Sequence, residues 1–498
     1  MYIAVILLDE VLVVVRQGRP VIFAIAAGLY LACALYPWHD QISIRRATGI
    51  VLVTLVLWIT EVAPLGVVAM AIPIAATFAG LLSWKDAVAA WGDEIIFLFL
   101  GAFLLARALE KHAVFDGLLG MRMLGGGGRR SDAWLVLVVL AVSGVLSTMQ
   151  NNTAVTAMML PLVITMSRRS RTPAALLIAL AWGATFGGMA TPVGTAPNFI
   201  GYAAMKKLDA TVSFVSWMKV GVPVWLGTTL IGWGVLRLAT AMGRGSAAAR
   251  RNAPGIFDDP TLTDVGPMLG DDAADRPAGS SRPARRWVIG AFITAILLWL
   301  VPGIVKSVTS PDEPAAIWIR TYLPESLVPI ALAWVLFVVR PGPDARPILD
   351  RRDFQALDWD TLFLIAGGLT LGRMLETSGF AGALAQGLAG VKLPPLVLML
   401  ALAFATVLLS ELTSNTATAS LMVPIAGSLA EALSISPVQA IWLVSLAASL
   451  GFALPISTPP NAIVYGTRRV PLRFMAATGI VVDILATVWL VCCVTMLG

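Results

Sequence analysis

The sequence predicts an all-α polytopic membrane protein with about eleven transmembrane helices and two re-entrant hairpins. Of its 498 residues, 58% are hydrophobic and only 13% are charged, whereas a soluble globular protein carries about 25% charged residues. The mean hydropathy is +0.84. At about 20 apolar residues for each crossing, this composition allows at most about fourteen spans. A soluble fold is therefore excluded, and we expect the lipid bilayer to surround most of the chain.

Long apolar runs are the candidates for complete crossings, because each approaches the length that a helix needs to cross the hydrocarbon core. Eleven runs meet this description. They lie at about 21–37, 47–62, 65–83, 94–109, 174–190, 215–241, 287–305, 322–339, 361–378, 436–454 and 474–497.

Two further apolar regions, 133–166 and 393–434, differ from these runs. Each is a pair of short apolar arms joined by a polar stretch, 147–153 in the first and 410–416 in the second. An arm of this length cannot cross alone, and bent backbone at membrane depth is tolerated only where protein or a watery cavity covers it. Both regions therefore predict re-entrant hairpins.

The loops predict the orientation of the chain. The long hydrophilic segment 243–286 holds seven arginines and six aspartates, which is typical of a linker. Arginine also clusters at 168–171, 340–352 and 468–473. Because basic loops stay in the cytoplasm, we expect the N-terminus and the linker to be cytoplasmic and the C-terminus to be outside. The expected location is the plasma (inner) membrane.

Catalytic chemistry has little support in the sequence. The chain has three cysteines and two histidines, and none has partners at metal-ligand spacing. Cys33, Cys492 and Cys493 lie in apolar runs, where the expected role is that of a small buried hydrophobe. Nucleotide-loop, nucleophile and zinc-protease motifs are missing, so we expect no enzyme. The net charge of +6 lies in loops without a basic face, which argues against a nucleic-acid partner.

Several ionisable residues accompany the apolar runs. Two pairs spaced i,i+3 predict ion pairs at a helix end or a domain interface, with substrate contact as the alternative. They are Arg107 with Glu110 and Arg373 with Glu376. Glu61 and Glu411 lie beside polar motifs and are either proton carriers or structural carboxylates. Asp483 is the one acidic residue of the last span, and the sequence assigns it no role.

A polar motif occurs twice, with its copies 263 residues apart. At the hairpin tips, Leu146, Ser147, Asn152, Thr153, Ala154 and Pro161 match Leu409, Ser410, Asn415, Thr416, Ala417 and Pro424. After the tips, Gly188, Pro192, Thr195, Pro197, Asn198 and Ile200 match Gly451, Pro455, Thr458, Pro460, Asn461 and Ile463. A weaker match, offset by 266, joins Gly101, Arg107, Leu109 and Glu110 to Gly367, Arg373, Leu375 and Glu376. Motifs that share an offset indicate a structural repeat.

The repeat divides the chain into an N-terminal segment with the first span (1–46), repeat 1 (47–242), the linker and repeat 2 (287–498). Each repeat contains one hairpin and one broken helix. The broken helices are expected at 174–210 and 436–466. An odd number of predicted crossings, five, separates the hairpins, so we expect the repeats to be inverted in the membrane.

Paired, interrupted hydrophobic segments in two halves mark the midplane binding site of a secondary transporter. Broken helices present N-terminal amides to an anion, and freed carbonyls, amide oxygens and hydroxyls can bind a monovalent cation. Two other classes stay as alternatives. An ion channel would need a continuous pore, and a membrane-embedded enzyme would need a nucleophile with a base or a metal cluster.

These residues resemble the divalent anion/sodium symporter family of dicarboxylate, citrate and sulfate transporters. The resemblance covers about 47–498 apart from the linker. It rests on the segment Trp58-Ile59-Thr60-Glu61-Val62-Ala63-Pro64-Leu65, on the paired tips and on the breaks that follow them. It implies two inverted repeats, a homodimer built on a scaffold domain, and a mobile transport domain that carries substrate by an elevator movement.

The resemblance also implies the site residues. The first sodium site would use Ser147, Asn151, Asn152 and the carbonyl of Gly194, and the second Ser410, Thr413, Asn415 and the carbonyl of Ser457. Substrate carboxylates would meet Asn152, Thr153, Asn415 and Thr416, with Thr195, Thr458 and Pro459 closing the pocket. The tip departs from the family pattern at Asn151, where serine is usual, and the break departs mildly at Ala196, where proline is usual.

The expected function is sodium-coupled import of a small dicarboxylate of the succinate, malate or fumarate type. It is favoured by two neutral tips that are rich in hydroxyls and amides and lack a basic residue. Two alternatives within the family stay open: a sodium-independent dicarboxylate exchanger, and a transporter of sulfate or another divalent oxyanion. The extra bulk and the NH2 group of Asn151 are the reason for keeping the exchanger.

Overall fold

The protein is described by a computed structural model. It describes residues 19–112, 114, 131–167, 170–209, 212–244, 282–308, 313–342, 346–380, 382–383, 386, 393–430 and 435–498. The predicted linker, 243–286, lies mostly outside this part. Within the described residues the secondary structure is entirely helical, as the sequence predicts.

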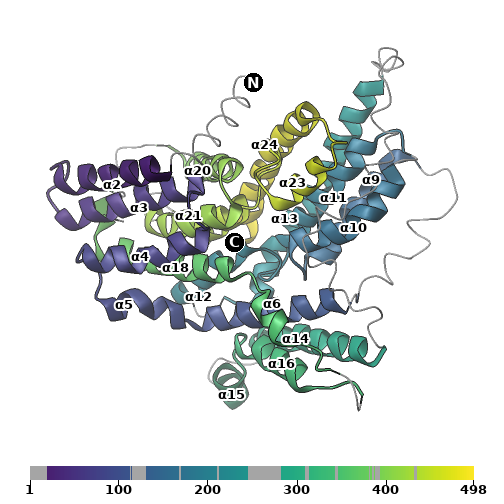
Figure 1. Cartoon of the computed structure of the whole chain (residues 1–498), viewed down its shortest axis with the longest axis horizontal. Coiled ribbons are helices and arrows are strands. Elements are labelled where there is room, and N and C mark those ends of the chain that lie inside the picture. Colours follow the sequence, from purple (N-terminus) through teal and green to yellow (C-terminus); the bar gives the residue numbers. More distant parts are fainter. Residues whose placement is uncertain are drawn as a thin grey trace.

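The first half runs from α2 to α13 (Figure 1). Its elements are α2 (Arg19–Leu35), α3 (Ile42–Thr60), α4 (Leu65–Phe78), α5 (Trp84–Ala89), the 3-10 turn η1 (Ala90–Gly92), α6 (Glu94–Lys111), α9 (Asp132–Ser147), α10 (Asn152–Ser167), α11 (Pro173–Gly188), α12 (Ala196–Leu208) and α13 (Phe214–Arg244).

The second half runs from α14 to α24. Its elements are α14 (Arg282–Val308), α15 (Pro314–Tyr322), α16 (Leu327–Val338), α17 (Arg351–Gln355), α18 (Trp359–Thr377), α20 (Pro395–Leu412), α21 (Asn415–Leu429), α22 (Pro437–Ala447), α23 (Pro459–Gly466) and α24 (Leu472–Leu497).

Each of the eleven apolar runs overlaps a helix. In the described part, five helical stretches are long and apolar enough to cross a membrane, namely Ile42–Thr60, Trp84–Lys111, Phe214–Met242, Pro395–Leu412 and Leu472–Leu497. An all-helical fold with several membrane-length helices is thus confirmed. The number of eleven crossings and the inverted orientation of the repeats stay predictions.

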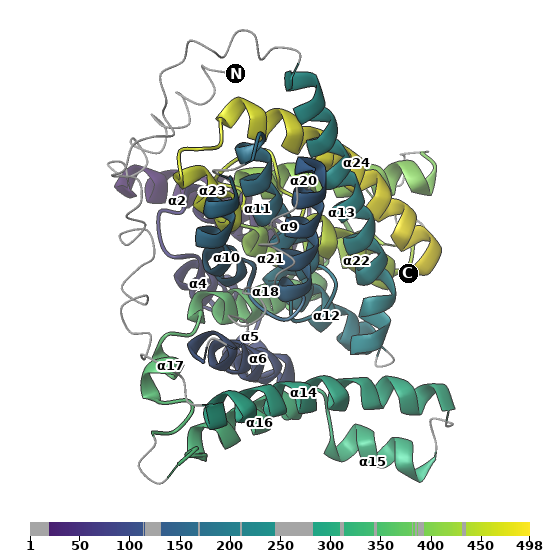
Figure 2. The same cartoon turned by 90° about the vertical axis from the view of Figure 1, so that its right-hand side faces the viewer.

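The helices pack as two groups. We call α2–α6 with α14–α18 the frame group, and α9–α13 with α20–α24 the hairpin group. In the frame group, α4 of the first half packs against α18 of the second, and α6 packs against α16. Figure 2 shows α14 and α16 side by side below α6. Equivalent helices thus exchange partners between the halves, which is the packing of an internally repeated chain.

Two glycines of the weak repeat make these exchanged contacts possible. A Cβ atom on Gly101 of α6 would lie 2.3 Å from the backbone nitrogen of Ile330 in α16. A Cβ atom on the matching Gly367 of α18 would lie 2.7 Å from the Cβ of Ala69 in α4. Real Cβ atoms essentially never approach so closely, so only glycine lets these helices touch.

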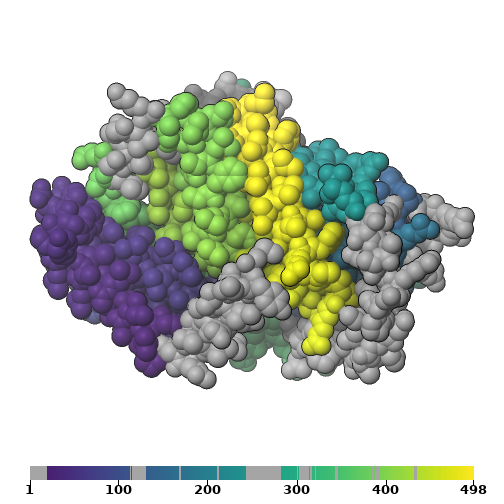
Figure 3. Space-filling view, turned by 90° about the horizontal axis from the view of Figure 1, so that it is seen from above, coloured from purple at the N-terminus to yellow at the C-terminus, as the bar shows by residue number. Residues whose placement is uncertain are grey.

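The hairpin group is centred on buried helices. Every residue of α11 from Ala175 to Gly188 is buried. α11 packs against α9, α10, α13 and α23, and α13 packs along α24. Seen from above, the second hairpin, α24 and α13 follow one another across the molecule (Figure 3). Because α11 has no exposed face, it can carry a polar break only where neighbouring chain satisfies the freed backbone groups.

Three expectations about single residues are tested by the packing. Arg107 contacts Glu110 at 3.2 Å, which confirms the first i,i+3 ion pair. Arg373 instead contacts Asp86 of α5 at 3.5 Å, because α5 packs beside α18. Cys493 is buried as expected, but Cys492 is exposed and Cys33 is half-buried. For these two the expectation of burial is wrong, because neighbouring residues of a helix point in different directions.

Candidate functional site

The tip of the first hairpin is closed by its own side chains. α9 ends at Ser147 and α10 begins at Asn152. Ser147 Oγ donates to Asn152 Oδ1 at 2.6 Å, and Asn151 Oδ1 accepts from the backbone nitrogen of Thr153 at 2.8 Å. Hydroxyl and amide groups that bond to nearby backbone compete with helical hydrogen bonds. They therefore explain why the chain leaves the helix here.

The break after α11 passes directly over this tip. A Cβ atom on Gly188 would lie 2.4 Å from Asn152 Oδ1, and one on Gly194 would lie 2.3 Å from the carbonyl oxygen of Gly188. Of the proposed first sodium ligands, Ser147 and Asn152 are thus in contact, and Gly194 lies beside them through Gly188. Asn151 is exposed, and with Gly194 and Thr195 it lines a small cavity of about 60 Å³ next to α6 and α14.

The second tip gathers oxygen atoms around one amide. A terminal atom of the Asn415 side chain lies 2.8 Å from Ser410 Oγ and 3.2 Å from each of the carbonyl oxygens of Ala448 and Ser457. With the amide nitrogen at this position, all three are hydrogen bonds. The orientation of an amide is assigned from such contacts, and these three place the nitrogen there, so hydrogen bonds satisfy the cluster in the structure described. A turned amide would present its oxygen beside the other three, which is the arrangement that a cation needs.

Thr413, the fourth proposed ligand, points elsewhere. Its hydroxyl lies 2.9 Å from the carbonyl oxygen of Leu409 and 2.6 Å from Thr418 Oγ1. The structure therefore brings Ser410, Asn415 and Ser457 together, whereas the Thr413 hydroxyl is bonded within the hairpin.

In each repeat, a buried asparagine donates hydrogen bonds to main-chain carbonyls at the interruption of the broken helix. Asn198 Nδ2 donates to the carbonyls of Gly188 at 2.9 Å and Thr191 at 2.8 Å. Asn461 Nδ2 donates to Gly451 at 3.3 Å and Leu454 at 3.1 Å. These contacts correspond one to one between the repeats. The predicted site does not include these two asparagines. Their equivalent positions in the repeated motif are the sequence signal that points to them.

In each repeat, the hairpin tip is hydrogen-bonded to the interruption of the broken helix, but through different groups. In the first repeat, Thr191 Oγ1 donates to the carbonyl of Thr148 at 2.5 Å. In the second, the Glu411 carboxylate accepts from the backbone nitrogens of Ala453 at 2.8 Å and Leu454 at 3.1 Å. Ser457 Oγ donates to the same carboxylate. These bonds fit the structural alternative for Glu411.

Asp483 of α24 supports the same break. Its Oδ1 accepts from the backbone nitrogen of Phe452 at 3.2 Å. Together, Asp483 and Glu411 satisfy three consecutive backbone N–H groups that the interrupted helix leaves without partners. This contact gives Asp483 the role that the sequence could not assign.

The proposed substrate residues lie at helix N-termini. Asn152 and Asn415 begin α10 and α21, whereas Thr195 and Thr458 directly precede α12 and α23. α10 packs against α23, and α12 against α21, so each hairpin lies beside the broken helix of the other half. Helix N-termini carry partial positive charge, and α10 and α21 begin without proline, so their first N–H groups can face a ligand. α23 begins with Pro459 and Pro460, which have no N–H. The N-termini of α10 and α21 therefore suit a small anion.

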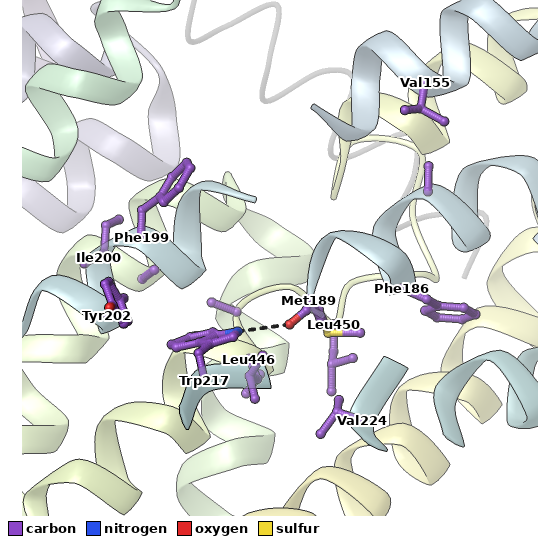
Figure 4. Close-up of a cluster of buried hydrophobic side chains, with 14 of the residues drawn as sticks. Val155, Phe186, Met189, Phe199, Ile200, Tyr202, Trp217, Val224, Leu446 and Leu450 are labelled. Carbon is purple, nitrogen blue, oxygen red and sulfur yellow. Dashed lines mark hydrogen bonds between the residues drawn. The ribbon is translucent and has the colours of Figure 1, made fainter. Parts of the chain in front are cut away.

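Apolar side chains pack around the end of α11. Trp217 Nε1 donates to the carbonyl of Met189 at 3.2 Å, at the point where α11 ends. Figure 4 shows Met189 and Trp217 among Leu446, Leu450 and Val224. Leu446 belongs to α22, Leu450 to the segment that follows it, and Val224 to α13. The break is therefore anchored to two neighbouring helices.

The fold and the duplicated site define a multi-pass membrane transporter rather than an enzyme. Residues 55–448 match the model of the citrate transporter family, CitMHS. The chain belongs to this family.

Characterised relatives agree with the resemblance seen in the sequence. The sodium-dependent dicarboxylate transporter SdcS of Staphylococcus saprophyticus is 27% identical over 455 residues, which cover 87% of this chain and 82% of the relative. SdcS of Staphylococcus aureus strain MSSA476 is 25% identical over 484 residues, 92% of this chain and 87% of the relative.

Two solved structures share the fold at low sequence identity. MtrF of Neisseria gonorrhoeae, described as representing a class of antimetabolite efflux pumps, has a TM-score of 0.55 and 13% identity, and the match covers 84% of this chain and 83% of MtrF. The YdaH transporter of Alcanivorax borkumensis has a TM-score of 0.51 and 15% identity, with 97% and 98% covered.

Proposed function

We propose that this transporter imports a small dicarboxylate such as succinate, malate or fumarate, driven by sodium. The observation that carries the proposal is the oxygen cluster at the second tip. A serine hydroxyl and two main-chain carbonyls converge there on the Asn415 side chain. With the amide turned so that its oxygen faces them, they form a set of hard, neutral oxygen ligands that suits a small monovalent cation. The name of the SdcS relatives supports the same ion and substrate class.

The anion would bind between the tips. The chain offers N-terminal amides, the amides of Asn152 and Asn415, and the hydroxyls of Thr153 and Thr416. Pro459 is exposed at the edge of this region, next to Thr458. A carboxylate away from water needs several such donors, and bound sodium nearby would offset its charge.

The coupling would require the hairpin group to move as a transport domain against the frame group, which would be the scaffold of a homodimer. We place the N-terminus and the linker in the cytoplasm and the C-terminus outside. Sodium is a coupling ion in this scheme and is carried together with the substrate.

Succinate uptake into proteoliposomes tests the proposal. An inward sodium gradient should drive accumulation, and an equal potassium gradient should not. Uptake that appears only with dicarboxylate inside the vesicles, and that ignores sodium, would identify an exchanger instead. Competition by malate, citrate and sulfate then assigns the substrate class, because hydroxyls and amides can bind each of these anions.

One observation favours the exchanger as the second candidate. Asn151 Oδ1 is already bonded to the backbone nitrogen of Thr153 at 2.8 Å. An oxygen engaged in this way is a weaker cation ligand than a free hydroxyl, so the first sodium site would be the weaker of the two.

A further inference from the structure

A cluster of charged residues joins the two helix groups away from the tips. α12 ends in two lysines, and each pairs with an acidic residue of the frame group. Lys206 Nζ lies 3.1 Å from Glu325 Oε2, in the loop between α15 and α16. Lys207 Nζ lies 2.8 Å from Asp93 Oδ2, at the N-terminus of α6.

Glu325 is the centre of this cluster. It is 7% exposed, and its carboxylate receives hydrogen bonds from three groups of the hairpin group. These are the hydroxyl of Tyr202, the ammonium group of Lys206 and the backbone nitrogen of Phe214. A buried carboxylate is stable only with such partners. A movement that carries α12 and the start of α13 away from Glu325 breaks all three bonds.

The cluster lies beside a cavity between the groups. Asp93 and Lys207 line this cavity, whose volume is about 710 Å³, together with residues of α18, α21 and α22. The frame group and the hairpin group thus meet on both sides of the cavity, at the charged cluster and where α18 packs against α21. The charged cluster is the polar part of this interface.

The same charged pattern occurs in the other repeat. Tyr202 and Lys206 match Tyr465 and Arg469 at the offset of 263. Glu325 and Glu61 each stand shortly before an equivalent helix of the frame group, α16 and α4 respectively. A tyrosine, a cation four residues later and a glutamate on the opposite group are therefore present twice.

The two copies are in different states. Tyr202 is 1% exposed and bonded to Glu325, whereas Tyr465 is 37% exposed. Glu61 is exposed as well and has a left-handed backbone with φ of 46°. In an inverted repeat, the two conformations of a transporter exchange the environments of equivalent residues. We therefore expect Tyr465 and Glu61 to be buried in the opposite conformation, in which Tyr202 and Glu325 would be exposed.

We propose that these residues form two alternating latches. Glu325 holds Tyr202 and Lys206 in the conformation described, and Glu61 holds Tyr465 and Arg469 in the opposite one. The inference rests on the proposed function in that the hairpin group moves against the frame group, and on the predicted inversion of the repeats. It adds the residues that stabilise each end of that movement.

Cross-linking tests the alternation. After replacement of the three native cysteines by alanine, one variant carries Lys206→Cys with Glu325→Cys, and a second carries Glu61→Cys with Arg469→Cys. Both pairs lie on opposite sides of the linker, so cleavage at a protease site inserted there separates the halves unless a short bifunctional reagent has joined them. A pair of Glu61→Cys with Arg468→Cys is the matched control.

The first pair should cross-link in the described conformation, and the second only when sodium or succinate shifts the protein to the other one. In a chain that carries both pairs, one cross-link should prevent the other. The proposal is overturned if the second pair never reacts while uptake is normal, if it reacts no better than the control, or if both cross-links form in one molecule.

Charge removal tests the energetic role. Glu325→Gln and Lys206→Gln should each shift the conformational equilibrium by about tenfold, because hydrogen bonds to charged groups are among the strong ones. The readout is labelling by an impermeant maleimide of Ser428→Cys, which lines the cavity, in the cysteine-free background. Glu61→Gln and Arg469→Gln should shift it the opposite way. Lys85→Gln, at an exposed lysine of α5, is the control.

Further variants and a comparison of labelling with uptake distinguish failure of the latch from failure of the proposed sodium coupling. Lys206 is partly exposed, so its variant carries the test if Glu325→Gln does not fold. Lys206→Arg, which keeps the ion pair, should leave the labelling at the wild-type level. Normal sodium-driven uptake with unchanged labelling in all four glutamine variants overturns the latch and leaves the function intact. Opposite labelling shifts without sodium-driven uptake support the latch and reject the proposed coupling.

Discussion

Replacement of Asn415 by alanine removes the amide at the centre of the second oxygen cluster. The wild-type side chain lies 2.8 Å from Ser410 Oγ and 3.2 Å from the carbonyls of Ala448 and Ser457. Each net hydrogen bond contributes about 1 kcal/mol, so three lost contacts amount to about 3 kcal/mol. If these bonds hold the oxygen cluster in its binding geometry, sodium affinity falls about a hundredfold without them. We therefore expect no uptake at ordinary sodium concentrations.

Two assays measure this loss. Sodium titration of succinate uptake in proteoliposomes gives the functional affinity. Sodium titration of the melting temperature of the purified protein gives binding without transport, because a ligand that binds only the folded state stabilises it. Gln439→Ala, which removes an amide from the exposed cap of α22, is the matched control. A variant with normal expression and wild-type titrations in both assays would refute the assignment of Asn415.

Further substitutions test the remaining parts of the site. Asn152→Ala should abolish uptake, because it removes the partner of Ser147 at 2.6 Å; normal uptake at normal expression contradicts this. Asn151→Ser should strengthen sodium dependence, and an unchanged sodium titration counts against a perturbing amide. Asn198→Ala should lower the stability by about 2 kcal/mol, since two buried carbonyls lose their donor, and an unchanged denaturation midpoint argues otherwise. Gly101→Ala should prevent folding, because its Cβ would lie 2.3 Å from Ile330 N; a monodisperse, wild-type-like protein in size-exclusion chromatography would oppose it.

The helices could be predicted because apolar composition and hairpin polarity depend on local sequence. A run of apolar residues long enough for the bilayer must satisfy its backbone internally, and a helix does so. The breaks at 148–151 and 413–414 were predicted for the same reason, since hydroxyl and amide side chains concentrate there. The duplicated motif locates both tips from the sequence alone.

Contacts between distant segments could not be predicted in this way. Asp483 has no neighbouring partner in sequence, and its role depends on Phe452, 31 residues away. Arg373 has Glu376 one turn later, but α5 brings Asp86 closer. Glu325 has no local signal of its role, because its partners lie more than 100 residues away.

Sodium-driven succinate uptake by the purified wild-type protein in proteoliposomes tests the central claim most directly. The account predicts accumulation that requires an inward sodium gradient and stops when potassium replaces sodium. Succinate uptake of equal rate and extent in the absence of sodium would contradict it.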